Sequence, residues 1–99
     1  MTIKIIFIQM KHPCKRIFTN KNEEIRYRMQ IPNIYDWINN NSSIDILKNA
    51  INDNSDDTHI RLTSMESYFN LSDDKKLFET LKEDQNVDIS KKAKEILNK

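Results

Sequence analysis

Arginine side chains are the groups in this sequence best suited to binding chemistry. All four of them lie in segments whose residue pattern predicts β-strands. A guanidinium group can hold a carboxylate or a phosphate through two parallel hydrogen bonds. If the strands share a sheet, we expect one face to form a basic binding site; the alternative is that these side chains only solvate an open sheet face. The four residues are Arg16, Arg26, Arg28 and Arg61.

A second candidate surface is acidic and lies in the middle of the chain. Residues 36–88 contain twelve acidic and five basic side chains, a net charge of −7, whereas residues 1–35 carry +5 and residues 89–99 carry +3. The overall net charge of +1 therefore hides a segregated distribution. We expect the acidic stretch to dock a positively charged partner, and it could occupy a phosphate-binding groove of a nucleic-acid enzyme, as CRISPR inhibitors can. The expected contact residues are Asp53, Asp56, Asp57, Asp73 and Asp74.

Catalytic and metal sites receive little support from the sequence. His12, Pro13 and Cys14 form the only local grouping of histidine with cysteine, and the neighbouring basic residues would favour a reactive thiolate. Pro13 fixes a turn that need not bring the imidazole to the sulfur. Two histidines and one cysteine cannot complete a common four-ligand zinc site without carboxylates or a partner. A small enzyme that uses Cys14 or His59 is the least favoured hypothesis, and we expect no metal and no cofactor.

The chain contains no glycine, which excludes a further class of site. Glycine-rich loops bring the backbone close to nucleotide phosphates, and the common nucleotide fingerprints need glycine at fixed positions. The loop at residues 52–57 is rich in Asn and Asp, which can adopt the left-handed conformations that glycine usually supplies. The sequence therefore lacks the glycine motifs that usually indicate a cofactor-dependent enzyme.

Strands are expected to position the arginines. Residues 2–10 place apolar side chains on both faces, as in a central strand, and residues 16–19 resume as a short strand. Apolar and polar residues alternate in residues 25–31, the clearest half-buried strand pattern, and Pro32 ends it. A later strand is expected at residues 59–63, which alternate around two apolar side chains.

Helical spacing of apolar residues predicts the remaining elements. A short helix is expected at residues 34–38, and Ser42 with Asp45 three residues later indicates the start of another. Aromatic residues at helical spacing are expected in the core. These aromatic residues are Tyr35, Trp37, Tyr68 and Phe69. The other expected helices lie at residues 42–51, 65–69, 72–81 and 90–99.

The order of these elements predicts an α+β fold in one compact domain that spans residues 1–99. A small antiparallel or mixed sheet would combine an N-terminal hairpin with one later strand, and three to four helices would pack with it. We find no internal repeat in the sequence. The succession of hairpin, helix and returning strand resembles that of ubiquitin-like β-grasp folds in element order alone.

These observations favour a small, non-enzymatic protein-binding module. We predict that it docks on an unidentified protein through complementary charge, as an inhibitor encoded by a phage or mobile element would, and the Ile-, Lys- and Asn-rich composition of an A/T-rich genome agrees with such a source. The alternative is a nucleic-acid-binding regulator that uses the strand-borne arginines and the lysine-rich C-terminal segment on phosphates. No apolar run can span a membrane and no signal peptide is visible, so we expect a cytoplasmic protein without a membrane partner.

Overall fold

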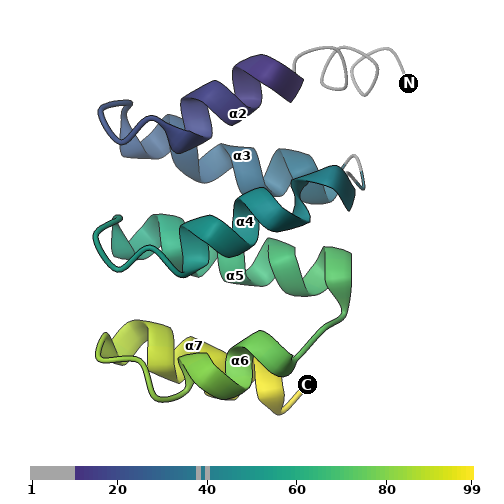
Figure 1. Cartoon of the computed structure of the whole chain (residues 1–99), viewed down its shortest axis with the longest axis vertical. Helices are drawn as coiled ribbons and strands as arrows, with labels where there is room; N and C mark the ends of the chain where they lie inside the picture. The colour runs from purple at the N-terminus through teal and green to yellow at the C-terminus, as the bar shows by residue number, and fades with distance from the viewer. Residues whose placement is uncertain (1–10, 38, 40) are drawn as a thin grey trace.

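The described part of the chain is built from helices joined by turns and loops (Figure 1). The computed structural model describes residues 11–37, 39 and 41–99, and none of these residues lies in a β-strand. Pairs of helices form three hairpins, which we call the first, second and third hairpin in chain order. Their helices are α2 (Lys11–Thr19) with α3 (Ile25–Trp37), α4 (Ile44–Ile51) with α5 (Thr58–Ser72), and α6 (Lys76–Leu81) with α7 (Val87–Leu97); a 3₁₀ turn, η1 (Asn41–Ser43), leads into α4.

The hairpins stack on one another along the long axis of the molecule, in chain order (Figure 1). Helix α5 is central: it contacts its partner α4, α3 of the first hairpin and α7 of the third. Each hairpin thus packs against its neighbours in sequence, as units of helical repeat arrays do. The loops inside the hairpins, residues 20–24, 52–57 and 82–86, gather along one side of the stack, at the left of Figure 1.

One hydrophobic core runs through the stack and takes side chains from each of the helices α2 to α7. Leu47 and Ile51 of α4 are fully buried, so the predicted helix at residues 42–51 is confirmed with its apolar face inward. Aromatic rings meet edge to face within the first hairpin, between Phe18 and Tyr35, with ring centroids 6.5 Å apart. Trp37 is 54% exposed, which corrects the expectation that it lies in the core. The buried apolar residues are Cys14, Phe18, Ile31, Tyr35, Leu47, Ile51, Ile60, Met65, Tyr68, Phe78, Leu81, Ile89, Ala93 and Ile96.

The predicted α+β fold with a β-grasp-like order is wrong for the part of the chain that the structure describes. Residues 16–19 belong to α2, residues 25–31 to α3, and residues 59–63 to α5. The expected strand at residues 2–10 lies outside the described residues. The arginines therefore sit on helices, and the strand-borne arginine face does not exist among residues 11–37 and 41–99.

The burial of Arg28 explains why the residue pattern of α3 predicts a β-strand. Its buried residues include Arg28, Ile31 and Tyr35, which have the helical spacing i, i+3 and i+7. The strand prediction treats Arg28 as a surface residue, so only Ile31 and Tyr35 of the buried helical stripe stand out as apolar. The alternation of apolar and polar residues at 25–31 then matches the pattern of a β-strand. Pro32 was expected to end a strand but lies inside α3, where it cannot donate a backbone hydrogen bond to the Arg28 carbonyl.

Helix ends differ from the sequence prediction at several positions. The expected helix at residues 34–38 is the end of α3, and that at 65–69 is the middle of α5. Ser72, expected to start a helix, is the last residue of α5, and α6 begins only at Lys76. Helix α7 starts at Val87, before the expected Ser90, because the Asn86 side chain accepts hydrogen bonds from the Asp88 and Ile89 N–H groups.

Left-handed backbone occurs outside the loop where we expected it. Within the described residues, positive φ is found at Asn39 (53°) and Asp73 (52°), and the loop at residues 52–57 contains none. Asp73 follows the last residue of α5, and its N–H bonds to the Phe69 carbonyl. Glycine commonly occupies this capping position, so an aspartate performs the task in a chain without glycine.

Candidate functional site

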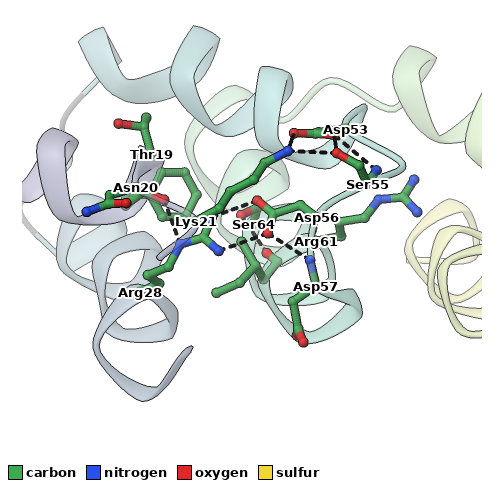
Figure 2. Close-up of polar contacts among 12 residues, drawn as sticks. Thr19, Asn20, Lys21, Arg28, Asp53, Ser55, Asp56, Asp57, Arg61 and Ser64 are labelled. Carbon is green, nitrogen blue, oxygen red and sulfur yellow. Dashed lines mark hydrogen bonds and ion pairs between the residues drawn. The ribbon is translucent and has the colours of Figure 1, made fainter. Parts of the chain in front are cut away.

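Arg28 clamps the first hairpin to the second. Its Nε donates to the Phe18 carbonyl (2.9 Å), which closes the first hairpin, while its two terminal nitrogens donate to the two Asp56 oxygens (2.9 and 2.6 Å). The side chains of Arg28 and Asp56 are 2% and 5% exposed. This two-pronged contact is the strongest geometry for an arginine–carboxylate pair, and it fixes the loop of the second hairpin against the first (Figure 2).

Arg61 makes the same kind of clamp between the second and third hairpins. Its Nε donates to the Ile51 carbonyl (2.8 Å) and a terminal nitrogen donates to Asp84 (2.9 Å). Each arginine therefore reaches a carbonyl ten residues before it in its own hairpin and a carboxylate in the next hairpin. Arg28 and Arg61 make equivalent contacts in successive hairpins and are 33 positions apart, so the first two hairpins form a structural repeat. The expectation that the chain contains no internal repeat therefore needs correction.

The loops of the first two hairpins are also tied together at the surface. Lys21 pairs with Asp53 (2.7 Å) and donates to the Ser55 hydroxyl (2.7 Å), as Figure 2 shows. Hydrogen bonds from Lys21 and then Ser55 lower the pKa of Asp53 to about 2. Direct polar contacts at the surface therefore link the two loops.

Two grooves open between the hairpins, one beside each clamp. The first groove, about 450 Å³, lies between α2 and α4; its walls include Lys15, Asp45 and Asn49, and Arg28 and Asp56 also line it. The second groove, about 690 Å³, lies between the loops of the second and third hairpins, beside Arg61. Its other lining residues are Asn52, Asn54, Thr80, Leu81, Glu83, Asp84, Gln85 and Asn86.

The carboxylates of the clamps are held in the charged state. Burial works to raise the pKa of Asp56, but hydrogen bonds from Arg28 and the Asp57 N–H, with the charge of Arg28, outweigh it and lower the pKa. At Asp84 burial is likewise outweighed, by the Asn86 N–H and by Arg61. Both clamps therefore remain ion pairs at neutral pH.

Acidification is expected to unfold the protein progressively below about pH 4. Because the folded-state pKa values of Asp53, Asp56 and Asp84 lie below their ordinary values, their stabilisation is complete above the ordinary pKa and is lost as the pH falls through the folded-state values. Melting temperatures measured from pH 7 to pH 2 check this. In Asp56→Asn the acid-dependent part of the decline should be smaller; an unchanged slope would show that the clamp is not its source.

The predicted acidic contact residues have structural roles in this arrangement. Asp53 and Asp56 pair with Lys21 and Arg28. Asp57 caps α5 by accepting from the His59 N–H (2.8 Å), and Asp73 and Asp74 form the connection to α6. Four of these side chains are therefore engaged within their own loop or with the neighbouring hairpin, namely Asp53, Asp56, Asp57 and Asp74, whereas Asp73 is exposed.

The four predicted basic residues divide into two groups. Arg28 and Arg61 are buried in the clamps, whereas Arg16 and Arg26 are exposed on α2 and α3. Arg26 pairs with Glu24 (2.7 Å) and stacks on the Tyr27 ring. The arginines consequently do not share one exposed face.

Cys14 is placed to pack rather than to react. It is buried in α2, and burial raises the pKa of its thiol, which disfavours the thiolate. His59 lies exposed on α5, and the side chain of His12 is not among those that the structure describes. Among the described residues no group of three or more His, Cys, Asp or Glu side chains could hold a metal ion.

Comparison with known proteins gives no relative. The chain matches no protein-family model, no curated protein and no solved structure. In the described part of the chain, no helix combines the length and apolar character that crossing a membrane requires. Function must therefore be inferred from the clamps, the grooves and the side chains that line them.

Sequence analysis missed the clamps although a signal for them was present. Glu23-Glu24 precede Arg28 in the same way that Asp56-Asp57 precede Arg61: two acidic residues, three others, then arginine. The two copies are 33 positions apart, as are the buried Tyr35 and Tyr68. A search for self-similarity at a fixed period would have found the hairpin repeat before any assignment of strands.

Proposed function

We propose that this chain is a protein-binding module that holds an extended segment of a partner protein in the grooves between its hairpins. The observation that carries the proposal is the second groove, which the Arg61–Asp84 clamp holds open beside a row of exposed amides. A preorganised groove loses little conformational entropy when a ligand enters it. Two such grooves lie between successive hairpins, one beside each clamp.

Amide side chains suit this groove to a peptide backbone. The side chains of Asn52, Asn54 and Gln85 are exposed, and no hydrogen bond among the described residues engages them. Each amide can both donate and accept, so it can pair with the alternating N–H and C=O groups of an extended chain. The groove therefore offers the hydrogen bonds that extended-peptide recognition uses.

Charge at the second groove favours a basic residue in the bound segment. The clamp neutralises Asp84 through Arg61, which leaves Glu83 as the uncompensated charge among the lining residues. A lysine or arginine side chain of the partner would complement it. In this proposal, the charge-complementary docking predicted for the acidic middle of the chain takes place at the second groove. The more specific role of an inhibitor encoded by a phage stays a prediction from composition.

Selection from a displayed library of random peptides on the immobilised full chain tests the proposal. Selected peptides should be extended, carry a basic residue and lose about tenfold or more in affinity for the double variant Asn54→Ala, Gln85→Ala, since each lost hydrogen bond weakens binding by about 1 kcal/mol. The matched control is Asn33→Ala, Asn98→Ala, which removes two exposed amides outside both grooves and should bind as the unaltered chain does.

Two outcomes would contradict the proposal. The first is that no peptide is enriched, or that the groove variant binds as tightly as the control. The second is salt-dependent binding of labelled DNA or RNA by the unaltered chain, which would favour the nucleic-acid alternative. The burial of Arg28 and Arg61 weighs against that alternative, because a phosphate could reach them only by displacing Asp56 and Asp84.

A further inference from the structure

The two clamps differ in how much of the arginine side chain they use. In the first clamp both terminal nitrogens of Arg28 donate to Asp56, so the guanidinium group is paired along its whole outer edge. In the second clamp one terminal nitrogen of Arg61, Nη2, donates to Asp84 (2.9 Å). Among the described residues, no hydrogen bond engages the other terminal nitrogen, Nη1. The second clamp therefore leaves one arm of the guanidinium group unused.

The unused nitrogen of Arg61 is accessible from the second groove. The Arg61 side chain is only 3% exposed, yet it lines this groove. Nη1 is not among the side-chain atoms of the described residues that are both fully buried and without a hydrogen-bond partner. A guanidinium group keeps its protons at every physiological pH, so Nη1 is a permanent donor. The groove therefore contains a charged donor that two other hydrogen bonds hold in place.

The loop of the third hairpin explains why this arm is unused. Between its two helices and before the capping residue, the second hairpin has residues 52–56 and the third has residues 82–85, one residue fewer. When the loops are aligned on the residues that cap α5 and α7, Gln85 stands at the position of Asp56. A neutral and exposed amide thus replaces the carboxylate that fills the fork of the first clamp.

Asp84 pairs with Arg61 from a different place in its loop. It precedes the capping residue of α7 by two positions, whereas Asp56 precedes that of α5 by one. One oxygen of Asp84 accepts from Arg61 Nη2, and the other accepts from the Asn86 N–H group (2.8 Å). Asp84 therefore divides its oxygens between two donors and does not span the guanidinium group as Asp56 does.

The charges around Arg61 favour a neutral acceptor for Nη1. The residues that line the second groove carry one positive charge, on Arg61, and two negative charges, on Glu83 and Asp84. A carboxylate or a phosphate that entered the groove would meet this net negative charge, whereas a carbonyl oxygen would not. Hydrogen bonds from a charged donor are stronger than those from a neutral amide, so a peptide carbonyl should pair with Arg61 in preference to the amide side chains.

On the basis of the proposed function, we propose that Arg61 Nη1 binds a main-chain carbonyl of the segment in the second groove. Gln85 keeps the position open because it is neutral and does not pair with the guanidinium group. The peptide carbonyl takes the place that a carboxylate oxygen takes in the first clamp. Arg61 thus joins two hairpins and also positions the backbone of the partner beside Glu83, which receives the basic side chain.

NMR of the guanidinium groups in the isotope-labelled full chain tests this contact. The probe is a tripeptide of alanine, lysine and alanine, acetylated at its N-terminus and N-methylamidated at its C-terminus, so it has peptide carbonyls and an ammonium group but no carboxylate. Titration of this probe should shift the guanidinium signals of Arg61. The signals of Arg28 are the internal control and should shift much less, because both of its terminal nitrogens are already paired.

Gln85→Glu is the variant that distinguishes the contact from simple charge attraction. A carboxylate at this position can pair with Nη1 of Arg61, so the variant should lose about tenfold or more in affinity for the tripeptide. Its urea midpoint should rise, because Arg61 gains a second acceptor. Thr80→Glu is the matched control, since it adds the same charge at another exposed residue of the groove and should bind the tripeptide at least as tightly as the unaltered chain does.

Three results would overturn the proposal. Equal affinity of Gln85→Glu and Thr80→Glu for the tripeptide would mean that only the negative charge of the groove attracts it. A larger shift of the Arg61 signals with the free-acid form of the tripeptide than with the methylamide would make a carboxylate the ligand. If library peptides bind but neither they nor the tripeptide move the Arg61 signals, the contact is wrong while the proposed function stands. A shift by the tripeptide without any enriched library peptide would instead support the contact and contradict the proposed function.

Discussion

Replacing Arg28 with alanine is expected to destabilise the protein by about 3–5 kcal/mol. The loss arises because Asp56, only 5% exposed, would keep a charge without its guanidinium partner, and the buried Phe18 carbonyl would lose its donor. Urea unfolding followed by far-ultraviolet circular dichroism measures the free energy of unfolding. Since Arg28 joins two hairpins, the effect should extend beyond α3.

The matched control for this change is Arg26→Ala, two residues earlier on the same helix. The Arg26 side chain is 71% exposed and pairs with an exposed glutamate, so its removal should alter stability by no more than about 0.5 kcal/mol. A double variant, Arg28→Met with Asp56→Leu, should recover part of the loss, because it leaves no unpaired charge in the interior. Equal stability of Arg28→Ala and Arg26→Ala would show that the clamp is not a stabilising contact.

Phe78→Ala is expected to have a comparable effect, about 3–5 kcal/mol. Phe78 is fully buried, and its ring meets Tyr68 and Phe69 edge to face at centroid distances of 5.9 and 6.2 Å. Helix α6 has six residues and buries only Phe78 and Leu81, so it depends on these side chains for its place against α5 and α7. Truncation would leave a cavity where the third hairpin meets the second.

Amide hydrogen exchange locates the effect of Phe78→Ala. Protection should fall most in α6 and α7, because the second hairpin retains its contacts with the first. Lys76→Ala, an exposed change in the same helix, is the control and should leave protection unchanged. Uniform loss of protection over all three hairpins would mean instead that Phe78 supports the whole stack equally.

Local sequence rules were sufficient where the buried face of a helix is apolar. Helix α4 buries Leu47 and Ile51, and helix α7 buries Ile89, Ala93 and Ile96; both were predicted, with errors at the ends. In these helices the apolar residues recur at helical spacing without interruption. The pattern therefore reports directly on which side faces the core.

The same rules failed where polar side chains enter the interior. Helix α5 buries Arg61, Ser64 and Ser67 beside its apolar residues, and α3 buries Arg28. The Ser64 hydroxyl donates to the Ile60 carbonyl (2.7 Å). The guanidinium groups of the two arginines donate to carbonyls and carboxylates of other segments. Such partners are distant in sequence or hidden in the helix backbone, so no periodicity of hydrophobic residues can reveal the burial.

The candidate site was hidden for a related reason. The sequence predicts that Arg28, Arg61 and Asp56 bind charged groups of a partner. In the structure, Arg28 and Asp56 instead bind one another. Charge alone cannot distinguish an internal ion pair from an external docking surface. The fixed spacing of the two acidic-acidic-x-x-x-arginine segments could have made that distinction, because a repeat implies contact between neighbouring units.

Stacking of each hairpin on its neighbours in sequence has a kinetic consequence. The main contacts join helices of one hairpin or of adjacent hairpins, and contacts between segments near one another in the chain favour fast folding. Nucleation can start in any hairpin and spread to the next. Within the described stack, α5 has neighbours on both sides and should therefore exchange its amides last.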